Sequence, residues 1–217
     1  MVWIISGILL LVAYLFGSIP TGYLIARSLK GIDIREQGSG STGATNVLRT
    51  VGKKAALATL LLDMLKGMAA IATVHLCYTF EFGGALPVSW KAWLVTLAGI
   101  IAILGHSKPV WLNFKGGKSV AASIGVLLVM SPAVALGTMG VFAATLWTWR
   151  IVSLGSIAGA VAVNALMLLF NQPLPYCLFA AVAGIYVILR HRSNIERLFA
   201  GTEPVIGQKL TQEVESH

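Results

Sequence analysis

Long apolar segments joined by short polar connections constrain the fold of this chain more than any other feature. Hydrophobic residues make up 57% of its 217 residues and charged residues 11%, against about 25% charged residues in a typical soluble domain. A soluble fold of this length could not bury so much apolar surface, whereas a lipid bilayer accommodates it. The sequence therefore predicts an all-α integral membrane protein.

The apolar segments predict seven transmembrane helices. A span needs about 20 mainly apolar residues, although some spans are shorter. Ser131-Pro132 separates the fourth and fifth, because proline disfavours helix in the residue before it. If residues 120–149 formed one tilted helix, the count would fall to six. The expected spans cover roughly residues 3–26, 55–78, 92–105, 120–130, 133–149, 151–170 and 176–189.

The distribution of lysine and arginine predicts the topology. With seven spans, all basic residues except Lys66 and Lys91 lie at one face of the membrane. Basic loops are retained in the cytoplasm, so we expect the N-terminus outside and the C-terminus inside. Six spans would put the basic residues after residue 189 outside, and this favours seven.

We expect one transmembrane domain over residues 1–217, with the first span retained and not cleaved as a signal peptide. Residues 198–217 form a short polar tail, in which Glu213, Glu215 and His217 are expected to be poorly ordered. The net charge of +8 resides in short membrane loops and no aromatic-basic platform is present, so we expect no nucleic-acid partner. The spacing of carboxylates, histidines and cysteines predicts neither a metal site nor a cofactor.

The first polar motif, at residues 38–49, combines groups that suit an anion. Glycines permit positive φ, and hydroxyls, an amide and an arginine provide donors. The alternative is a flexible loop capped by serine or threonine. The relevant residues are Gly38, Ser39, Gly40, Ser41, Thr42, Gly43, Thr45, Asn46 and Arg49.

The second motif, at residues 105–119, contains Gly116-Gly117-Lys118-Ser119. A nucleotide P-loop requires another glycine where Leu112 stands, so that site is rejected. Phosphate binding by the glycine backbone and Lys118 stays open. His106, near the end of the third span, is a candidate general base or a structural histidine.

The third motif, at residues 190–195, follows the last span. If the helix continues, His191 and Asn194 share one face at i, i+3. His191 could bind phosphate, act on a hydroxyl or be a surface histidine. Within the second span, Asp63 and Lys66 have the same spacing and are expected to pair in the protein interior, either structurally or facing the polar site.

Together these motifs resemble the acyl-phosphate-dependent glycerol-3-phosphate acyltransferase family of bacteria. The resemblance covers nearly the whole chain. It is carried by segments 15–22, 38–49, 63–67, Gly105-His106, 114–118 and 190–195.

The resemblance implies transfer of a fatty acyl group from acyl phosphate to the 1-hydroxyl of glycerol 3-phosphate. The products would be 1-acyl-glycerol 3-phosphate (lysophosphatidic acid) and inorganic phosphate, in the first acylation of bacterial phospholipid synthesis. It also implies a multi-pass protein of the bacterial inner membrane, with its site facing the cytoplasm and a possible transient contact with a soluble enzyme that produces acyl phosphate.

The same resemblance assigns the site residues. Ser39, Thr45 and Asn46 would line the phosphate site, with Gly40 and Gly43 in the same loop. Arg49 and Lys118 would hold phosphates, and Gly116 and Gly117 would let backbone approach the ligand. His191 and Asn194 would complete the pocket.

Two other classes of protein remain to be weighed. A small anion transporter would show inverted repeats or helices broken at mid-membrane, and the sequence shows no repeat. A phosphatidyl-type transferase would need clustered aspartates around a metal, and Asp33 and Asp63 are the only aspartates.

Overall fold

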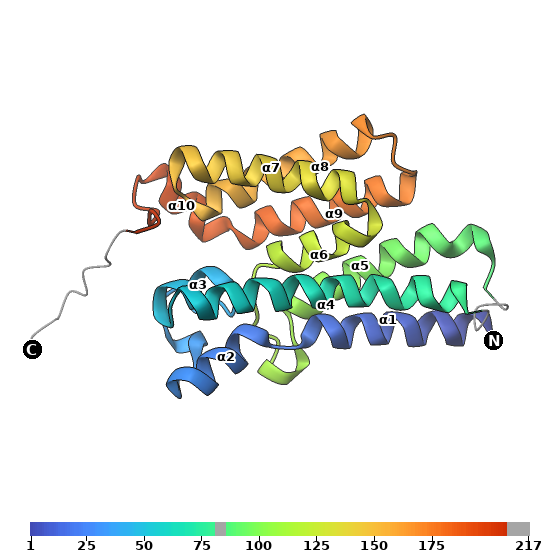
Figure 1. Ribbon diagram of the computed structural model, residues 1–217, viewed down its shortest axis with the longest axis horizontal. Coiled ribbons are helices and arrows are strands. Elements are labelled where there is room, and N and C mark those ends of the chain that lie inside the picture. The colour runs from blue at the N-terminus through green and yellow to red at the C-terminus, as the bar shows by residue number, and fades with distance from the viewer. Residues whose placement is uncertain (81–85, 208–217) are drawn as a thin grey trace, which may run out of the picture.

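The computed structural model describes residues 1–80 and 86–207, which are helical and contain no β-strand (Figure 1). In the described part of the chain, short 3-10 turns lie between α-helices at Ile34–Glu36, Val88–Trp90 and Val110–Leu112. The helices are α1 (Val2–Ser18), α2 (Thr21–Lys30), α3 (Ala44–Thr50), α4 (Lys53–Thr79), α5 (Lys91–Ser107), α6 (Val120–Met130), α7 (Pro132–Trp149), α8 (Val152–Leu169), α9 (Leu174–Arg190) and α10 (Arg192–Phe199).

Several helices are long and apolar enough to cross a membrane. In the described part of the chain there are five such stretches, and α9 with α10 makes a sixth if the bent pair is one span. The helix α6 is shorter, with 11 residues. Six of the seven predicted segments each coincide with one helix, from α4 to α9, and the predicted break at Ser131-Pro132 separates α6 from α7. The five stretches are Val2–Lys30, Lys53–Thr79, Val88–Leu112, Pro132–Trp149 and Val152–Leu169.

The first predicted span is not one continuous helix. α1 ends at Ser18 and α2 begins at Thr21, so the expected span over residues 3–26 is interrupted. Ile19 has φ −56° and ψ 117°, outside the helical region, as its position before Pro20 favours. The prediction of one uninterrupted span over residues 3–26 is therefore wrong at Ile19-Pro20.

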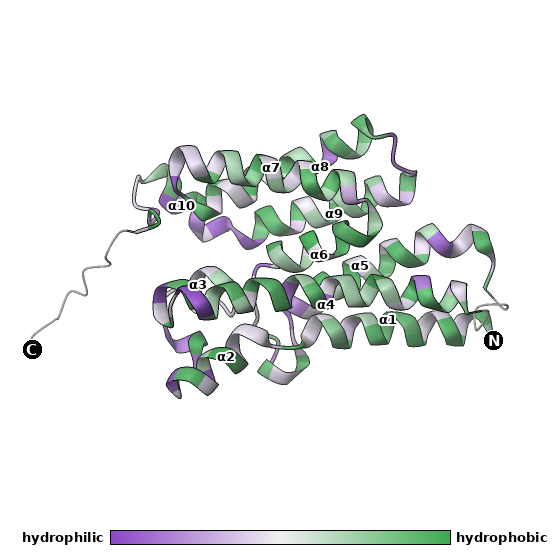
Figure 2. Cartoon of the chain, viewed as in Figure 1, coloured by the Kyte–Doolittle hydropathy of each residue, from purple (hydrophilic) through white to green (hydrophobic). Residues whose placement is uncertain are grey.

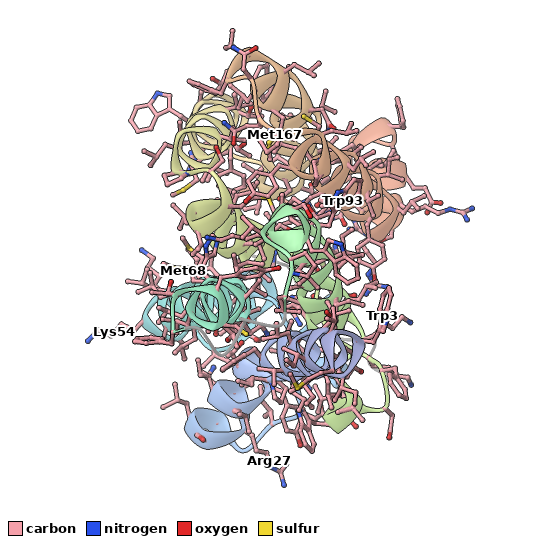
Figure 3. The ribbon with its side chains drawn as sticks, turned by 90° about the vertical axis from the view of Figure 1, so that its right-hand side faces the viewer. Trp3, Arg27, Lys54, Met68, Trp93 and Met167 are labelled. Atoms are coloured by element: carbon pink, nitrogen blue, oxygen red, sulfur yellow. The ribbon has the colours of Figure 1, made fainter. Side chains whose placement is uncertain are left out.

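The helices run mostly along one axis in two groups (Figures 1 and 3). α1 packs against α4 and α5, while α7, α8 and α9 form the second group. α6 lies between them, in contact with α4 and α7. Small residues permit this packing: a Cβ on Gly125 of α6 would lie 2.0 Å from the Met64 carbonyl oxygen of α4.

Polar residues gather at the end of the bundle that carries α2, α3 and α10, opposite the N-terminus (Figure 2). The last described residues return to this end, where the Ile206 amide donates to the Arg150 carbonyl over 2.8 Å. Large apolar side chains are exposed elsewhere along the bundle, including Leu136 at 62% and Leu168 at 71%. Such exposure suits a lipid environment. Glu213, Glu215 and His217, which the sequence predicts to be poorly ordered, lie outside the described residues.

Candidate active site

A cavity of about 330 Å³ begins at the polar end of the bundle and extends between the two helix groups. Its polar end brings together residues from all three sequence motifs. Its inner part is apolar: Leu127, Val163 and Phe179 line it. On α8 the lining runs from Val152 to Val163, eleven residue steps that advance about 16.5 Å along the helix. The motif residues that line it there include Ser39, Ser41, Gly43, Thr45, Asn46, Arg49, Lys118, Ser119, His191 and Asn194.

One side of the cavity lies between α4 and α7. Leu60 and Met64 of α4 line it on one side, and Met139 and Ala143 of α7 line it on the other. Leu60, Met139 and Ala143 are exposed and Met64 is half-buried. The cavity therefore has a side wall that faces the apolar surroundings of the bundle.

Asn46 organises the first motif. Its amide nitrogen donates to the carbonyl oxygens of Ile34, Gln37 and Ser41 at 3.1, 2.9 and 2.9 Å. Its oxygen accepts from the Ser39 amide at 3.1 Å. The side chain is buried and its polar atoms are occupied, so Asn46 shapes the loop and has little capacity left for a ligand.

We expect Asn46→Ala to destabilise the protein by about 1–3 kcal/mol, because buried carbonyls lose their donor. Thermal unfolding of the purified variant measures the loss. Thr148→Ala, which removes an exposed hydroxyl bonded within α7, is the control and should unfold like the wild type. An Asn46→Ala protein as stable as this control would contradict the organising role.

Several side chains of the first motif keep free donors at the cavity, including the Ser41 hydroxyl, which among the described residues only accepts, from the Gly43 amide. Within residues 1–80 and 86–207, the Ser39 and Thr45 hydroxyls and the Arg49 guanidinium make no hydrogen bond or ion pair. They are available to an anion. The glycines differ from expectation: Gly40 has φ +67° but does not line the cavity, while Gly43 lines it with an ordinary φ of −77°.

Gly116 and Gly117 contact α5 and do not line the cavity. Their amides donate to the carbonyls of Ser107 and His106 over 3.1 and 3.2 Å, so these donors are not free for phosphate. A Cβ on Gly117 would lie 2.1 Å from His106 Nε2. The two glycines thus let the loop pack onto α5, which is a different role from the backbone approach to the ligand that the sequence predicts.

Lys118, His191 and Asn194 meet at the polar end. The Lys118 ammonium donates to the Asn194 side-chain oxygen. The predicted continuous helix is bent by 60° between α9 and α10, with His191 at the bend. His191 Nδ1 lies 2.7 Å from the Val187 carbonyl, so Nδ1 carries a proton and the Nε2 of the neutral ring is a hydrogen-bond acceptor.

Glu203 is a site residue that sequence reasoning missed. Its carboxylate accepts hydrogen bonds from Ser153 at 2.8 Å, Asn194 at 2.6 Å and Arg197 at 2.7 Å. It lines the cavity and is buried. The sequence carries little signal for it, because Glu203 lies in the segment interpreted as a polar tail, and its three partners lie on α8 and α10.

Asp63 and His106 also line the cavity. The predicted pair of Asp63 and Lys66 is confirmed, with 2.8 Å between the carboxylate and the ammonium. His106 Nδ1 lies 3.4 Å from the same carboxylate oxygen.

The polar end carries excess positive charge. Burial lowers the pKa of Lys118 to about 8, the Glu203 carboxylate acts in the opposite direction, and Arg197, Arg49 and Arg190 lower it further. One half-buried lysine and three arginines thus lie near the Glu203 carboxylate. An anion in the cavity would offset this repulsion.

Comparisons with known proteins agree with this arrangement. Residues 7–201 match the family model for glycerol-3-phosphate acyltransferase. A glycerol-3-phosphate acyltransferase of Rippkaea orientalis is 62% identical over the full length of both chains. One from Nostoc sp. is 59% identical, over 97% of this chain and 96% of its own.

A crystal structure of PlsY (YgiH), an integral membrane glycerol 3-phosphate acyltransferase, in its glycerol 3-phosphate form, superposes with a TM-score of 0.83. It shows 38% identity and covers 93% of this chain and 96% of that one. The lysophosphatidic acid form gives a TM-score of 0.80 over 93% and 95%. The chain thus belongs to the glycerol-3-phosphate acyltransferase family of integral membrane enzymes.

Proposed function

We propose that the chain transfers a fatty acyl group from acyl phosphate to the 1-hydroxyl of glycerol 3-phosphate, releasing 1-acyl-glycerol 3-phosphate and inorganic phosphate. The observation that carries this proposal is one cavity with a cationic, hydroxyl-rich end and a long apolar interior. Such a shape accommodates phosphates and a fatty chain at the same time. In a bacterium this reaction would be the first acylation of phospholipid synthesis.

The cations have a direct role in the proposed reaction. Both substrates carry negative charge, and Lys118 and Arg49 would offset their repulsion. Ser39 and Thr45 would donate to phosphate oxygens. Holding the two substrates together removes much of the entropic barrier to a bimolecular reaction.

His191 would accept a hydrogen bond from the glycerol hydroxyl, because its Nε2 carries no proton. The hydroxyl oxygen forms a new bond to the acyl carbon, and the bond from that carbon to the phosphate oxygen breaks. The hydroxyl proton ends on the released phosphate, so no nucleophile of the protein is consumed. Asn194 would act by holding Lys118, and Asn46 by holding the first motif.

The topology is part of the proposal. Seven crossings with the N-terminus outside would put the polar end of the bundle, with its basic residues, in the cytoplasm. The enzyme would then lie in a bacterial inner membrane, with its site open to soluble glycerol 3-phosphate. Acyl phosphate would arrive from the bilayer or by transient contact with a soluble enzyme that makes it.

The reaction is tested with purified protein reconstituted in lipid. Palmitoyl phosphate and glycerol 3-phosphate should together give phosphate and lysophosphatidic acid. Palmitoyl-CoA and the thioester of acyl carrier protein serve as competing donors. Product formed only from a thioester would refute the acyl-phosphate donor, and no product from any donor would favour an anion transporter.

The activity should depend on pH through Lys118. Its pKa is lowered to about 8, so the side chain is charged below this pH and neutral above it. We expect kcat/KM for glycerol 3-phosphate to fall about tenfold per pH unit above pH 8. Arginine keeps its charge throughout this range, so the Lys118→Arg profile should lack this decline. The same decline in that variant would assign it to another group.

A further inference from the structure

A buried charged cluster beside the cavity has no part in the reaction described above. One oxygen of Asp63, Oδ1, accepts from the Thr21 hydroxyl over 2.5 Å and faces the Lys66 ammonium at 2.8 Å. The same oxygen lies 3.4 Å from His106 Nδ1. Asp63 and His106 are both at least nine-tenths buried and both line the cavity. The carboxylate thus joins α2, α4 and α5 at the cavity wall.

The Asp63 carboxylate determines how the His106 ring presents itself. His106 Nδ1 is buried and makes no hydrogen bond within the described residues, so Asp63 is the negative group that this nitrogen faces. A neutral imidazole carries one proton, and a carboxylate near Nδ1 favours the proton there. Nε2 is then without hydrogen.

The bare Nε2 edge allows the loop to approach closely. This nitrogen lies where the Cβ of a larger residue at 117 would stand, 2.1 Å from that position. A hydrogen on Nε2 would point into the same space. The Gly117 amide also donates to the His106 carbonyl, and the Gly117 carbonyl accepts from Arg190 over 3.2 Å. The backbone of Gly117 is therefore held between His106 and Arg190, one residue before Lys118.

We propose that Asp63 is a positioning residue for acyl transfer, which acts through His106 on the Gly117 backbone and thereby on the place of Lys118. This proposal rests on the proposed function, because Lys118 is the cation that would hold substrate phosphate. Lys66 neutralises the carboxylate and also donates to the Ile19 carbonyl at the break between α1 and α2, over 2.7 Å. Asp63, Lys66 and His106 thus connect the break between α1 and α2 to the polar end of the cavity.

The test separates positioning from simple charge balance. Asp63→Leu with Lys66→Met removes both charges, and replacing a buried ion pair with apolar residues is often neutral for stability. The Ile19 carbonyl keeps the Thr21 amide as a donor, at 3.0 Å. We expect this double variant to unfold near the wild-type temperature but to show a KM for glycerol 3-phosphate raised about tenfold, with a much smaller change in kcat. A wild-type KM in a folded double variant overturns the proposal.

A second variant leaves the ion pair intact. His106→Phe places a C–H group where Nε2 carries no hydrogen, so the Gly117 backbone must shift, and the same rise in KM is expected. An unchanged KM in His106→Phe overturns the proposal, also where the double variant fails to fold. Thr73→Val is the matched control, because Thr73 lies on α4, does not line the cavity, and its hydroxyl bonds, among the residues that the structure describes, only to the Ala69 carbonyl. The KM of this control should equal that of the wild type.

Binding of inorganic phosphate to each purified protein, measured by calorimetry, provides a readout independent of turnover. Weaker phosphate binding in both test variants supports the positioning role, and wild-type binding in both overturns it. A wild-type protein that binds phosphate but transfers no acyl group refutes the proposed reaction, while the comparison of phosphate affinities still decides the role of Asp63.

Discussion

Lys118→Ala is expected to lower kcat/KM about 10²–10³-fold while the protein still folds. Lys118 is a half-buried cation at the polar end of the cavity, where partial exclusion of water strengthens its interaction with a developing negative charge. Its removal leaves one acceptor, the Asn194 oxygen, without its donor. Phosphate release in the reconstituted system measures the effect, with thermal unfolding as the check on folding.

Lys115→Ala is the matched control for this result. Lys115 lies in the same loop, is exposed and does not line the cavity. Its removal takes away the same formal charge but should leave kcat/KM within about twofold, because exposed charges are screened by water and salt. Normal turnover in Lys118→Ala, or an equal loss in both variants, would remove Lys118 from the site.

Glu203→Ala is expected to reduce both stability and activity. Without the carboxylate, Ser153, Asn194 and Arg197 lose an acceptor, and Asn194 loses the contact that orients it toward Lys118. We expect a loss of stability of about 2–3 kcal/mol, below that of a fully buried ion pair because Arg197 is partly exposed to water. Thermal unfolding and phosphate release measure the two effects.

Glu196→Ala serves as the control, because Glu196 pairs with Arg192 at the surface and such pairs contribute about 0–1 kcal/mol. Equal stability of Glu203→Ala and Glu196→Ala would contradict the proposed role of Glu203.

Burial alone would raise the pKa of Glu203, but hydrogen bonds from Asn194, Ser153 and Arg197 lower it. The stability that Glu203 contributes is therefore present above the pKa of an unfolded glutamate and is lost as the pH falls through the lower folded value.

Most of the helical framework could be predicted from the sequence, because a span of apolar residues leaves a chain in lipid few alternatives to helix. The break at Ile19-Pro20 could not be predicted from the sequence, because a proline alone does not determine whether a transmembrane helix is interrupted. Proline occurs within transmembrane helices when neighbours satisfy the freed groups, and the donors that do so here include Lys66, far along the chain.

Site residues could be predicted from the sequence where the residue type itself provides the chemistry. They could not be predicted where the role depends on a contact with another part of the chain. Lys118 and Arg49 are cations within polar motifs, so residue type alone makes them candidates for binding an anion. The role of Gly117 depends on what it faces, which is His106, and the sequence shows only its lack of a side chain. Glu203 is recognisable only through partners on other elements, 50 residues away in the case of Ser153.

The side wall between α4 and α7 has a consequence for how the rate of such an enzyme would depend on the concentration of a lipid substrate. A fatty chain that enters there moves from one hydrocarbon environment to another, so the hydrophobic effect contributes little to its binding. Discrimination between acyl donors would then depend on contacts at the polar end of the cavity. The rate would follow the mole fraction of donor within the leaflet and not its amount per volume of solution, and adding inert lipid would slow turnover at constant total donor.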